Sequence, residues 1–148
     1  MRISTKGRYG LRAMVDLAVY SAGDQVTLKS IAERQNISEG YLEQVFSMLR
    51  KAGLISSIKG AQGGYILAGK PEDITIGAVL RALEGDLSVV DEKSMNEGTK
   101  DMIEKCIRES IWDKINSSID SVVDNITLED LVKEYRKTLG NEAIMYYI

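Results

Sequence analysis

The fold is decided by residues 27–54, TLKSIAERQNISEGYLEQVFSMLRKAGL. Thr27 is a residue type that caps helix N-termini. After it, Leu28, Ile31 and Ala32 share one face of a helix. The stretch therefore begins with a short helix that buries one of its sides.

A second, longer helix follows a turn at residues 36–37. Ser38 can cap this helix, and Glu39 in its first turn suits the positive end of the helix dipole. Apolar side chains then recur at the spacing of a buried stripe, at Leu42, Val45, Phe46 and Leu49. Gly53 stands where a helix commonly ends. Two helices joined by a short turn are typical of a helix-turn-helix.

The sequence on either side extends this pair. Residues 4–20 have the apolar periodicity of a helix. Residues 54–59 and 64–68 are short, isoleucine-bearing segments around the glycine-rich residues 60–64, a pattern that predicts a β-hairpin. Pro71 marks the end of this unit. This order of elements predicts a winged helix-turn-helix, a mostly α fold with a small β-hairpin wing.

The rest of the chain is also mostly helical in pattern. We expect a helix over residues 75–83 and a loop over residues 85–98. The longest helical pattern covers residues 99–123. Thr127 begins a capping box and a last short helix. The tail, residues 141–148, is unusually apolar for a chain end.

Charge is distributed unevenly along the chain. Residues 1–70 carry ten basic and five acidic side chains, whereas residues 71–148 carry nine basic and 17 acidic ones. Such segregation favours one part that faces nucleic acid and another with a different role. We therefore expect a winged helix-turn-helix DNA-binding domain at 1–84, a loop at 85–98, and a dimerisation helix with a C-terminal tail at 99–148.

The composition excludes several kinds of site. The 148 residues include no histidine and one cysteine, which excludes Ser-His-Asp and Cys-His pairs and any metal cluster that needs several thiolates from one chain. Residues 60–64 match neither a dinucleotide fingerprint nor a P-loop. We expect no enzymatic activity, no cofactor and no metal. The sequence has no apolar leader and no run of about 20 apolar residues, so we expect a cytoplasmic protein without membrane contact.

The predicted helix after Ser38 offers polar side chains to DNA, because a helix fits the major groove with its N-terminal residues at the base edges. Gln44 has the donor and acceptor to pair with adenine, and Glu43 can accept from cytosine. The expected base-reading residues are Ser38, Tyr41, Glu43, Gln44 and, at the hairpin tip, Gln62. The expected DNA-backbone contacts are Ser4, Lys6, Arg8, Lys29, Arg50, Lys51 and Lys59. The alternative is a protein-interaction adapter that does not bind DNA.

The pattern over residues 99–123 predicts a contact between two copies of the chain. Its isoleucines recur every four residues, at Ile103, Ile107, Ile111, Ile115 and Ile119. So broad a stripe needs a partner surface, and a two-fold contact is the commonest kind. The alternative is a helix packed wholly within its own chain. Cys106 lies on this stripe, and we expect a buried, inert thiol rather than a redox switch.

Several spaced motifs agree in order and distance with a known family. They are STKGRYG at 4–10, IS and YLEQ within 37–44, LRKAGLI at 49–55, GAQGGY at 60–65, ITIG and LEG within 74–85, and ITLEDL at 126–131. With these motifs the chain resembles the Rrf-two family of bacterial transcription regulators over nearly its whole length. The resemblance implies a dimeric winged-helix repressor or activator on a two-fold operator. It also implies that residues 99–123 form the long helix that crosses its counterpart in the dimer.

The resemblance separates two kinds of relative. Family members that sense iron–sulfur clusters hold the cluster with three cysteines in the region that corresponds to about 85–107, with help from a histidine. Here that region contains only Cys106, and the chain has no histidine. The chain is thus most similar to the cluster-free repressors of cysteine metabolism. A regulator of iron–sulfur or redox genes remains the alternative.

The same resemblance implies a protein partner. Repressors of cysteine metabolism in this family form a complex with O-acetylserine thiol-lyase, the cysteine synthase, which also accepts C-terminal isoleucine peptides in its active site. Our hypothesis is that Tyr146, Tyr147 and Ile148 form such an insertion tail. A terminal carboxylate suits backbone N–H donors, and an isoleucine fills an apolar pocket. The alternative is a tail that packs on its own dimer.

Overall fold

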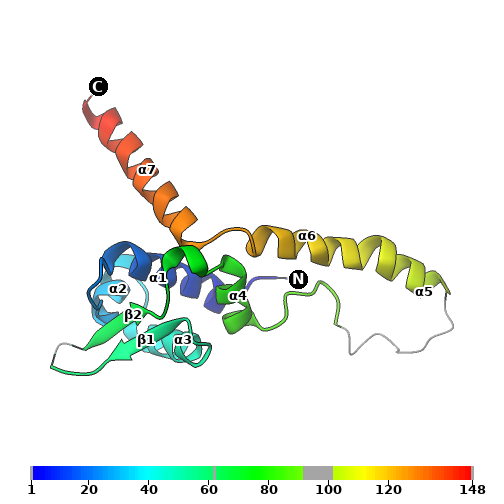
Figure 1. The fold of residues 1–148 in the computed structure, drawn as a ribbon, viewed down its shortest axis with the longest axis horizontal. Helices are drawn as coiled ribbons and strands as arrows, with labels where there is room; N and C mark the ends of the chain where they lie inside the picture. Colours follow the sequence, from blue (N-terminus) through cyan, green and yellow to red (C-terminus); the bar gives the residue numbers. More distant parts are fainter. Residues whose placement is uncertain (1, 62, 92–101, 148) are drawn as a thin grey trace.

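The computed structural model describes residues 2–61, 63–91 and 102–147. Helices α1 to α4 and a two-stranded wing form the body of the molecule, while α5, α6 and the outer part of α7 extend away from it (Figure 1). In chain order the elements are α1 (Thr5–Tyr20), α2 (Leu28–Gln35), α3 (Glu39–Lys51), β1 (Ile55–Ile58), β2 (Gly64–Leu67), the 3-10 turn η1 (Pro71–Asp73), α4 (Ile76–Glu84), α5 (Met102–Ile107), the π-helical turn η3 (Arg108–Trp112), α6 (Asp113–Val123) and α7 (Leu128–Tyr147). The mostly α fold with a β-hairpin wing is confirmed.

The first four helices begin at hydroxyl caps. The side-chain oxygen of each cap accepts a hydrogen bond from the backbone N–H three residues further on, and the four caps are Ser4, Thr27, Ser38 and Thr75. Asn36 closes α2 in the left-handed conformation, with φ of 53°. Asparagine tolerates this conformation better than most residues, so it makes the turn between α2 and α3. The predicted helix-turn-helix is therefore confirmed.

The core lies between α1, α3 and α4 and extends to the base of α7. The predicted stripe of α3 is at most 1% exposed at all four positions, Leu42, Val45, Phe46 and Leu49. Leu128 and Val132 from the start of α7 are equally buried and join the same core. The fold thus places the first turns of α7 beside α1, and the outer part of α7 leaves the body (Figure 1).

The segment before α2 pairs with the second strand of the wing. Strands β1 and β2 pair antiparallel, with Ile55 opposite Leu67. Val26 and Tyr65 exchange two backbone hydrogen bonds, of 2.9 and 2.8 Å. A Cβ at Gly64 would lie 2.7 Å from the Val26 carbonyl oxygen, so the close approach requires glycine. This third segment beside the hairpin was not predicted from the sequence.

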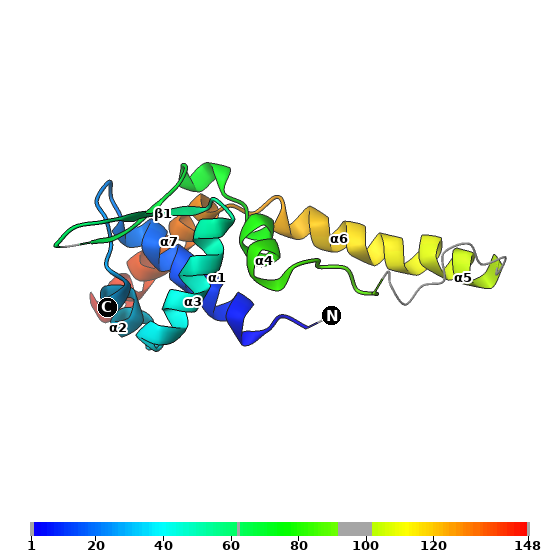
Figure 2. The same ribbon diagram turned by 90° about the horizontal axis from the view of Figure 1, so that it is seen from below.

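The long helix differs in detail from the single α-helix expected over residues 99–123. From Met102 to Val123 the chain is helical, but the π-helical turn η3 lies in its middle, while residues 99–101 lie outside the described residues. A four-residue spacing drifts around an α-helix of 3.6 residues per turn. A π turn takes more residues per turn and so counteracts this drift. Seen from below, α5 and α6 form one rod that leaves the body (Figure 2).

The prediction of a short last helix followed by a tail is wrong. Helix α7 runs for 20 residues, to Tyr147. Its predicted capping box is present: the Thr127 N–H donates to Asp130 Oδ2 at 3.0 Å, and the Asp130 N–H donates to Thr127 Oγ1 at 3.2 Å. Hydrogen bonding of the Asp130 carboxylate to the Thr127 backbone N–H, and then to the Thr127 side chain, lowers the pKa of this carboxyl. Beyond Val132 the helix is exposed, so its sequence lacks the buried stripe that would have revealed its length.

The segment after α4 was predicted to be a loop. Of the predicted loop at 85–98, residues 85–91 are described and contain neither helix nor strand, although Leu87 is buried against the core. Residues 92–98 lie outside the described residues. No helix in the described part of the chain has the length and apolar character needed to span a lipid bilayer.

Candidate nucleic-acid interface

The first turns of α3 present two of the predicted base-reading side chains to solvent. Glu43 and Gln44 are exposed, on the side of α3 opposite to its buried stripe. Tyr41 is half-buried because its ring lies edge-on to Tyr9 of α1, with centroids 6.0 Å apart. The Ser38 hydroxyl accepts from the Tyr41 N–H at 3.2 Å and caps the helix. Ser38, Glu43 and Gln44 are therefore exposed, and of these three only Ser38 is engaged as a helix cap.

A groove of about 410 Å³ lies between the start of α2, the first turns of α3 and the wing. Lys29 and Glu43, both predicted contacts, line this groove together. Thr27, Glu39 and Ser57 line it as well, and none of them was predicted as a site residue. Their positions could have identified them. Thr27 is the cap of α2, Glu39 follows the cap of α3, and Ser57 lies on the exposed face of β1.

The predicted backbone contacts are spread over the body rather than gathered at one point. Arg50 and Lys51 lie in the last turn of α3, about 18 Å along the helix from Ser38. Lys59 is exposed at the end of β1. Gln62, predicted at the tip of the wing, lies outside the described residues. A ligand that touched all these cations would have to extend along α3 and the wing, as a DNA duplex does.

The first turn of α1 contributes the remaining predicted contacts in unequal ways. Arg8 is exposed, with one guanidinium nitrogen 3.2 Å from Thr5 Oγ1, and Lys6 is half-buried. Ser4 is engaged within the protein, because its hydroxyl donates to Glu84 Oε1 and accepts from the Gly7 N–H. Ser4 therefore caps α1 and ties it to α4. Its contact with DNA remains a prediction.

A buried carboxylate fixes α2 against α1. Asp16 is 3% exposed and accepts from Arg34 Nε at 3.0 Å, Arg34 Nη2 at 2.8 Å and Gln35 Nε2 at 2.9 Å. The hydrogen bond to Asp16 raises the pKa of Arg34, whose guanidinium also lies 4.0 Å from the centre of the Tyr20 ring. A buried charge is stable only when it is paired and hydrogen-bonded in this way. The ion pair of Asp16 and Arg34 holds α2 of the helix-turn-helix against α1, and it was not predicted from the sequence.

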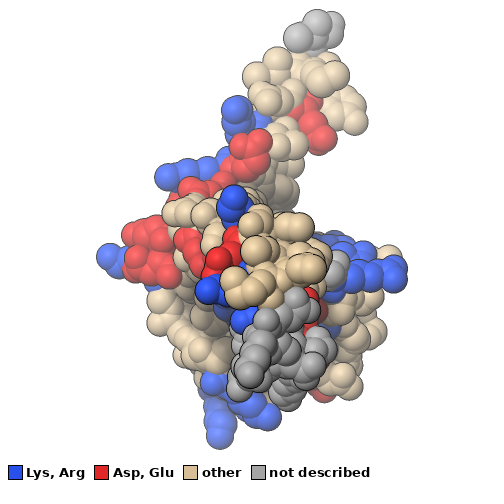
Figure 3. All heavy atoms as spheres, turned by 90° about the vertical axis from the view of Figure 1, so that its right-hand side faces the viewer, with Lys and Arg blue, Asp and Glu red and all other residues tan. Residues whose placement is uncertain are grey.

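The distribution of charge over the surface agrees with the asymmetry of the sequence. Figure 3 looks at the side from which α6 extends. Basic side chains gather at the lower and right-hand margins of the body in this view, and side chains of both signs lie near the base of α7 and along it. A polyanion such as DNA would be attracted to the basic margins.

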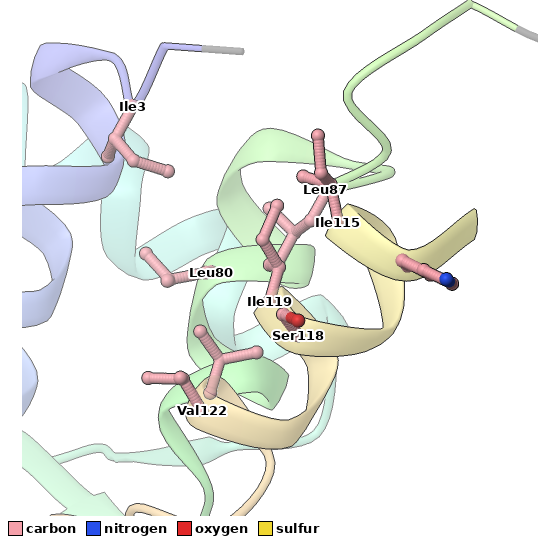
Figure 4. Close-up of a pocket in the computed structure, with 9 residues that line it drawn as sticks. Ile3, Leu80, Leu87, Ile115, Ser118, Ile119 and Val122 are labelled. Atoms are coloured by element: carbon pink, nitrogen blue, oxygen red, sulfur yellow. The ribbon is translucent and has the colours of Figure 1, made fainter. Parts of the chain in front are cut away.

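The isoleucine stripe of the rod is exposed at one end and packed at the other. Ile103 is 72% exposed and Ile111 44%. Ile107 is half-buried, and Ile119, near the other end, packs against the core of its own chain. A pocket of about 550 Å³ lies at this end, where Ile115 and Ile119 face the side of α4, with Ile3 across from them (Figure 4). Exposed apolar surface of this extent marks an interaction site.

Cys106 is not buried, contrary to the expectation from the sequence. In the single chain its thiol is free and exposed on α5. Among the residues that the structure describes, the element that α5 contacts most is η3, its own continuation in the rod.

A helix-turn-helix with an exposed second helix, a wing beside it and basic margins defines a winged helix-turn-helix DNA-binding protein. The chain matches the model of the Rrf2 family, described as an iron-dependent transcriptional regulator, over residues 3–134, and it belongs to that family. Like its relatives it is a transcriptional regulator of the helix-turn-helix type.

Individual relatives agree over most of the chain. The chain is 45% identical to the HTH-type transcriptional regulator CymR of Bacillus subtilis over 149 residues, which cover 100% of both chains. The solved structure of CymR, the global cysteine regulator of B. subtilis, matches with a TM-score of 0.77 and 43% identity, covering 90% of this chain and 98% of that one. The structure of T. potens IscR matches with a TM-score of 0.75 and 46% identity, covering 93% of this chain and 90% of that one.

The iron named in the family description does not fit the donors of this chain. The sequence holds one cysteine and no histidine, whereas an iron–sulfur cluster needs several thiolate or imidazole ligands. Among the described residues, no group of three cysteine, aspartate or glutamate side chains is placed to hold a metal ion. Cys106 stands on an exposed helix surface without neighbouring donors of that kind in the described part of the chain. We therefore derive no role for iron.

Proposed function

We propose that the protein acts as a homodimer that binds a two-fold DNA operator and represses transcription. The observation that carries this proposal is the exposed isoleucine stripe, on a rod that leaves the DNA-binding body. Two copies joined through Ile103, Ile107, Ile111, Ile115 and Ile119 would bury this stripe and present two recognition helices. Helix-turn-helix dimers read two half-sites whose symmetry mirrors their own.

The DNA contacts follow from the arrangement of the body. Gln44 and Glu43 read bases in the major groove, together with Ser38 and Tyr41 at the start of α3. Lys29 and Lys59 contact phosphates on either side of the groove between α2 and the wing. This assignment is supported by the exposure of Glu43 and Gln44 and by the groove that Lys29 lines.

Gln44→Ala tests this assignment. If Gln44 pairs with adenine, the variant loses about 1–3 kcal/mol of discrimination at one base pair and binds other sequences as before. Lys59→Ala is the matched control, because loss of a phosphate contact weakens binding to all sequences alike and reduces the salt dependence. Fluorescence anisotropy with single-base operator variants measures both effects. Equal loss at every base pair in Gln44→Ala would contradict base reading, and duplex binding independent of salt would favour the adapter.

The regulated genes are those of cysteine metabolism in this proposal. It is supported by 45% identity over the full length to CymR and by the similarity to the structure of that global cysteine regulator. A regulator of iron–sulfur or redox genes is the second candidate, and the description of the family as iron-dependent supports it. The side chains available as cluster ligands favour a regulator of cysteine metabolism, since the chain has a single cysteine and no histidine. We place the protein in the cytoplasm, where operators lie.

The partner tail is a further part of the proposal. Tyr146 is 90% exposed near the end of α7, Tyr147 is the last residue of that helix, and Ile148 lies outside the described residues. Insertion into the active site of O-acetylserine thiol-lyase therefore requires the last helical turn to open, and helix ends fray readily.

Deleting Tyr147 and Ile148 tests the partner tail. We expect the truncated protein to lose its affinity for O-acetylserine thiol-lyase, measured by titration calorimetry, while it keeps its affinity for DNA. The matched control, Glu142→Gln, changes an exposed side chain of α7 and leaves the last three residues in place. Unchanged affinity of the truncated protein for the enzyme would remove the tail from the proposal.

A further inference from the structure

The end of α6 is fastened to α4 by one arginine. Arg81 donates to both carboxylate oxygens of Asp124, at 2.6 and 3.1 Å, and to Asp120 Oδ1 at 2.7 Å. Asp120 lies in the last turn of α6 and Asp124 caps it. The hydrogen bond from Arg81 lowers the pKa of Asp124, and the same bond raises the pKa of Arg81, so these two side chains form a charged pair. We call these three side chains the α4–α6 joint.

Backbone contacts also connect α4 and its flanks to the end of α6 and the segment after it. Gly77 of α4 touches the end of α6 so closely that a Cβ there would collide with Asp124 Oδ1. Two backbone hydrogen bonds, of 2.8 and 2.9 Å, join residues 74–76 to residues 126–128 on the other side of the joint. The end of α6 is therefore held by two sets of contacts. One is the backbone contact near Gly77 and residues 126–128, and the other is the three hydrogen bonds that Arg81 donates.

The rod that begins at this joint is long enough to magnify a change of angle. Met102–Val123 holds 22 residues, which corresponds to a helix of about 33 Å. A rotation of about 10° at the joint would displace the far end of such a helix by about 6 Å. Successive base pairs are separated by about 3.4 Å. A small change at the joint thus shifts a recognition helix by more than one base pair relative to its partner.

We propose that Arg81, acting through Asp120 and Asp124, determines the half-site spacing that the protein accepts in its operator. This inference rests on the proposed dimer, because only a dimer has a spacing between two recognition helices. Arg81 is a positioning residue: it lies on α4 and fixes the direction in which the isoleucine stripe leaves the body. The spacing of half-sites is a geometric property of such dimers.

The expected change in the preference for one half-site spacing is small, because the side chains of the joint are partly exposed. The side chains of Arg81, Asp120 and Asp124 are 39%, 56% and 44% exposed. Ion pairs this exposed contribute modestly to stability, although bidentate arginine–carboxylate pairs are among the stronger ones. We therefore expect loss of the joint to relax the preference for one spacing about two- to fivefold and to leave the fold intact.

The test uses R81K, which keeps the charge but loses the planar fork that two carboxylates require. The probes are duplexes with the inverted repeat recovered from bound genomic DNA, at its natural spacing and with one base pair added or removed at the centre. The measured quantity is the ratio of affinities for natural and altered spacing. Equal numbers of phosphates are contacted in each duplex, so the salt-dependent part of the affinity cancels in this ratio.

We expect the ratio to fall about two- to fivefold in R81K and to stay unchanged in the matched control K137Q, which removes an exposed charge of α7 away from the joint. If sedimentation shows that R81K is monomeric, the same test is made with D120N, which removes one hydrogen-bonded ion pair of the joint. The inference is overturned if R81K and D120N remain dimeric, keep their affinity for a single half-site and still show the same ratio of affinities for natural and altered spacing as the unaltered protein. If the unaltered protein binds one half-site as tightly as two, the dimeric operator proposal itself fails, and the spacing role fails with it.

Discussion

Replacing Ile115 by aspartate should separate the dimer into monomers and reduce affinity for a two-half-site operator by at least about 100-fold. Ile115 is 40% exposed on α6 and is the fourth of the five isoleucines of the stripe. The proposed dimer would bury this side chain, and an unpaired carboxylate there would lose its hydration without gaining a partner. A monomer binds one half-site at a time and loses the high effective concentration of the second.

The matched control for this variant is Ser117→Asp, which adds the same charge two residues further along α6. Ser117 is exposed and does not belong to the stripe. Sedimentation equilibrium measures the oligomeric state, and anisotropy titration measures the affinities for one and for two half-sites. We expect I115D to keep its affinity for a single half-site. A dimeric I115D with full operator affinity would show that the stripe is not the contact between copies.

Replacing Phe46 by alanine should lower the free energy of unfolding by about 3–5 kcal/mol. Phe46 is fully buried, at 0% exposure, and its ring meets that of Tyr65 edge-on, with centroids 4.9 Å apart. Its removal leaves a cavity between α3 and the wing, which the packed surroundings fill only in part. For a chain of about 150 residues, this loss corresponds to a fall in Tm of roughly 6–20 °C.

The conservative variant Phe46→Leu separates the lost volume from the lost ring. It keeps most of the apolar volume, and we expect it to cost less than about 1.5 kcal/mol. Denaturation in urea, followed by circular dichroism, measures both variants. A cost below about 1 kcal/mol for F46A would mean that the wing and α3 are not packed together through this ring.

The parts of the fold that could be predicted from the sequence depend on local chemistry. Ser38 and Thr127 accept hydrogen bonds from N–H groups three residues away, so the residues that begin each helix lie next to it in the sequence. The buried stripe of α3 follows from periodicity in the same way. The wing followed from its glycines and its isoleucines.

The parts that could not be predicted depend on residues far apart in the sequence. Asp16 appears within an apolar helical pattern, and nothing near it in the sequence indicates that Arg34 and Gln35 will bind it. Arg81 likewise meets Asp120 and Asp124 only after the chain has returned from the rod. The length of α7 was also missed, because its outer part buries no stripe.

The candidate site was predicted unevenly for the same reason. Glu43 and Gln44 could be identified because an amphipathic helix has a definite exposed face. Ser4 looks like a phosphate contact in the sequence, but Glu84, 80 residues away, occupies its hydroxyl. Cys106 was expected to be buried because its stripe is apolar, yet it is exposed in the single chain.

The most direct test of a dimeric repressor of cysteine metabolism is to sequence the genomic DNA that the purified protein retains, with and without O-acetylserine thiol-lyase. We predict enrichment of inverted repeats upstream of sulfur-assimilation genes, stronger when the enzyme is present. Inverted repeats at other genes would contradict the assignment to cysteine metabolism and leave the dimeric operator intact. Retained DNA without a common inverted repeat under either condition would contradict the central claim that two copies of this chain read a two-fold operator.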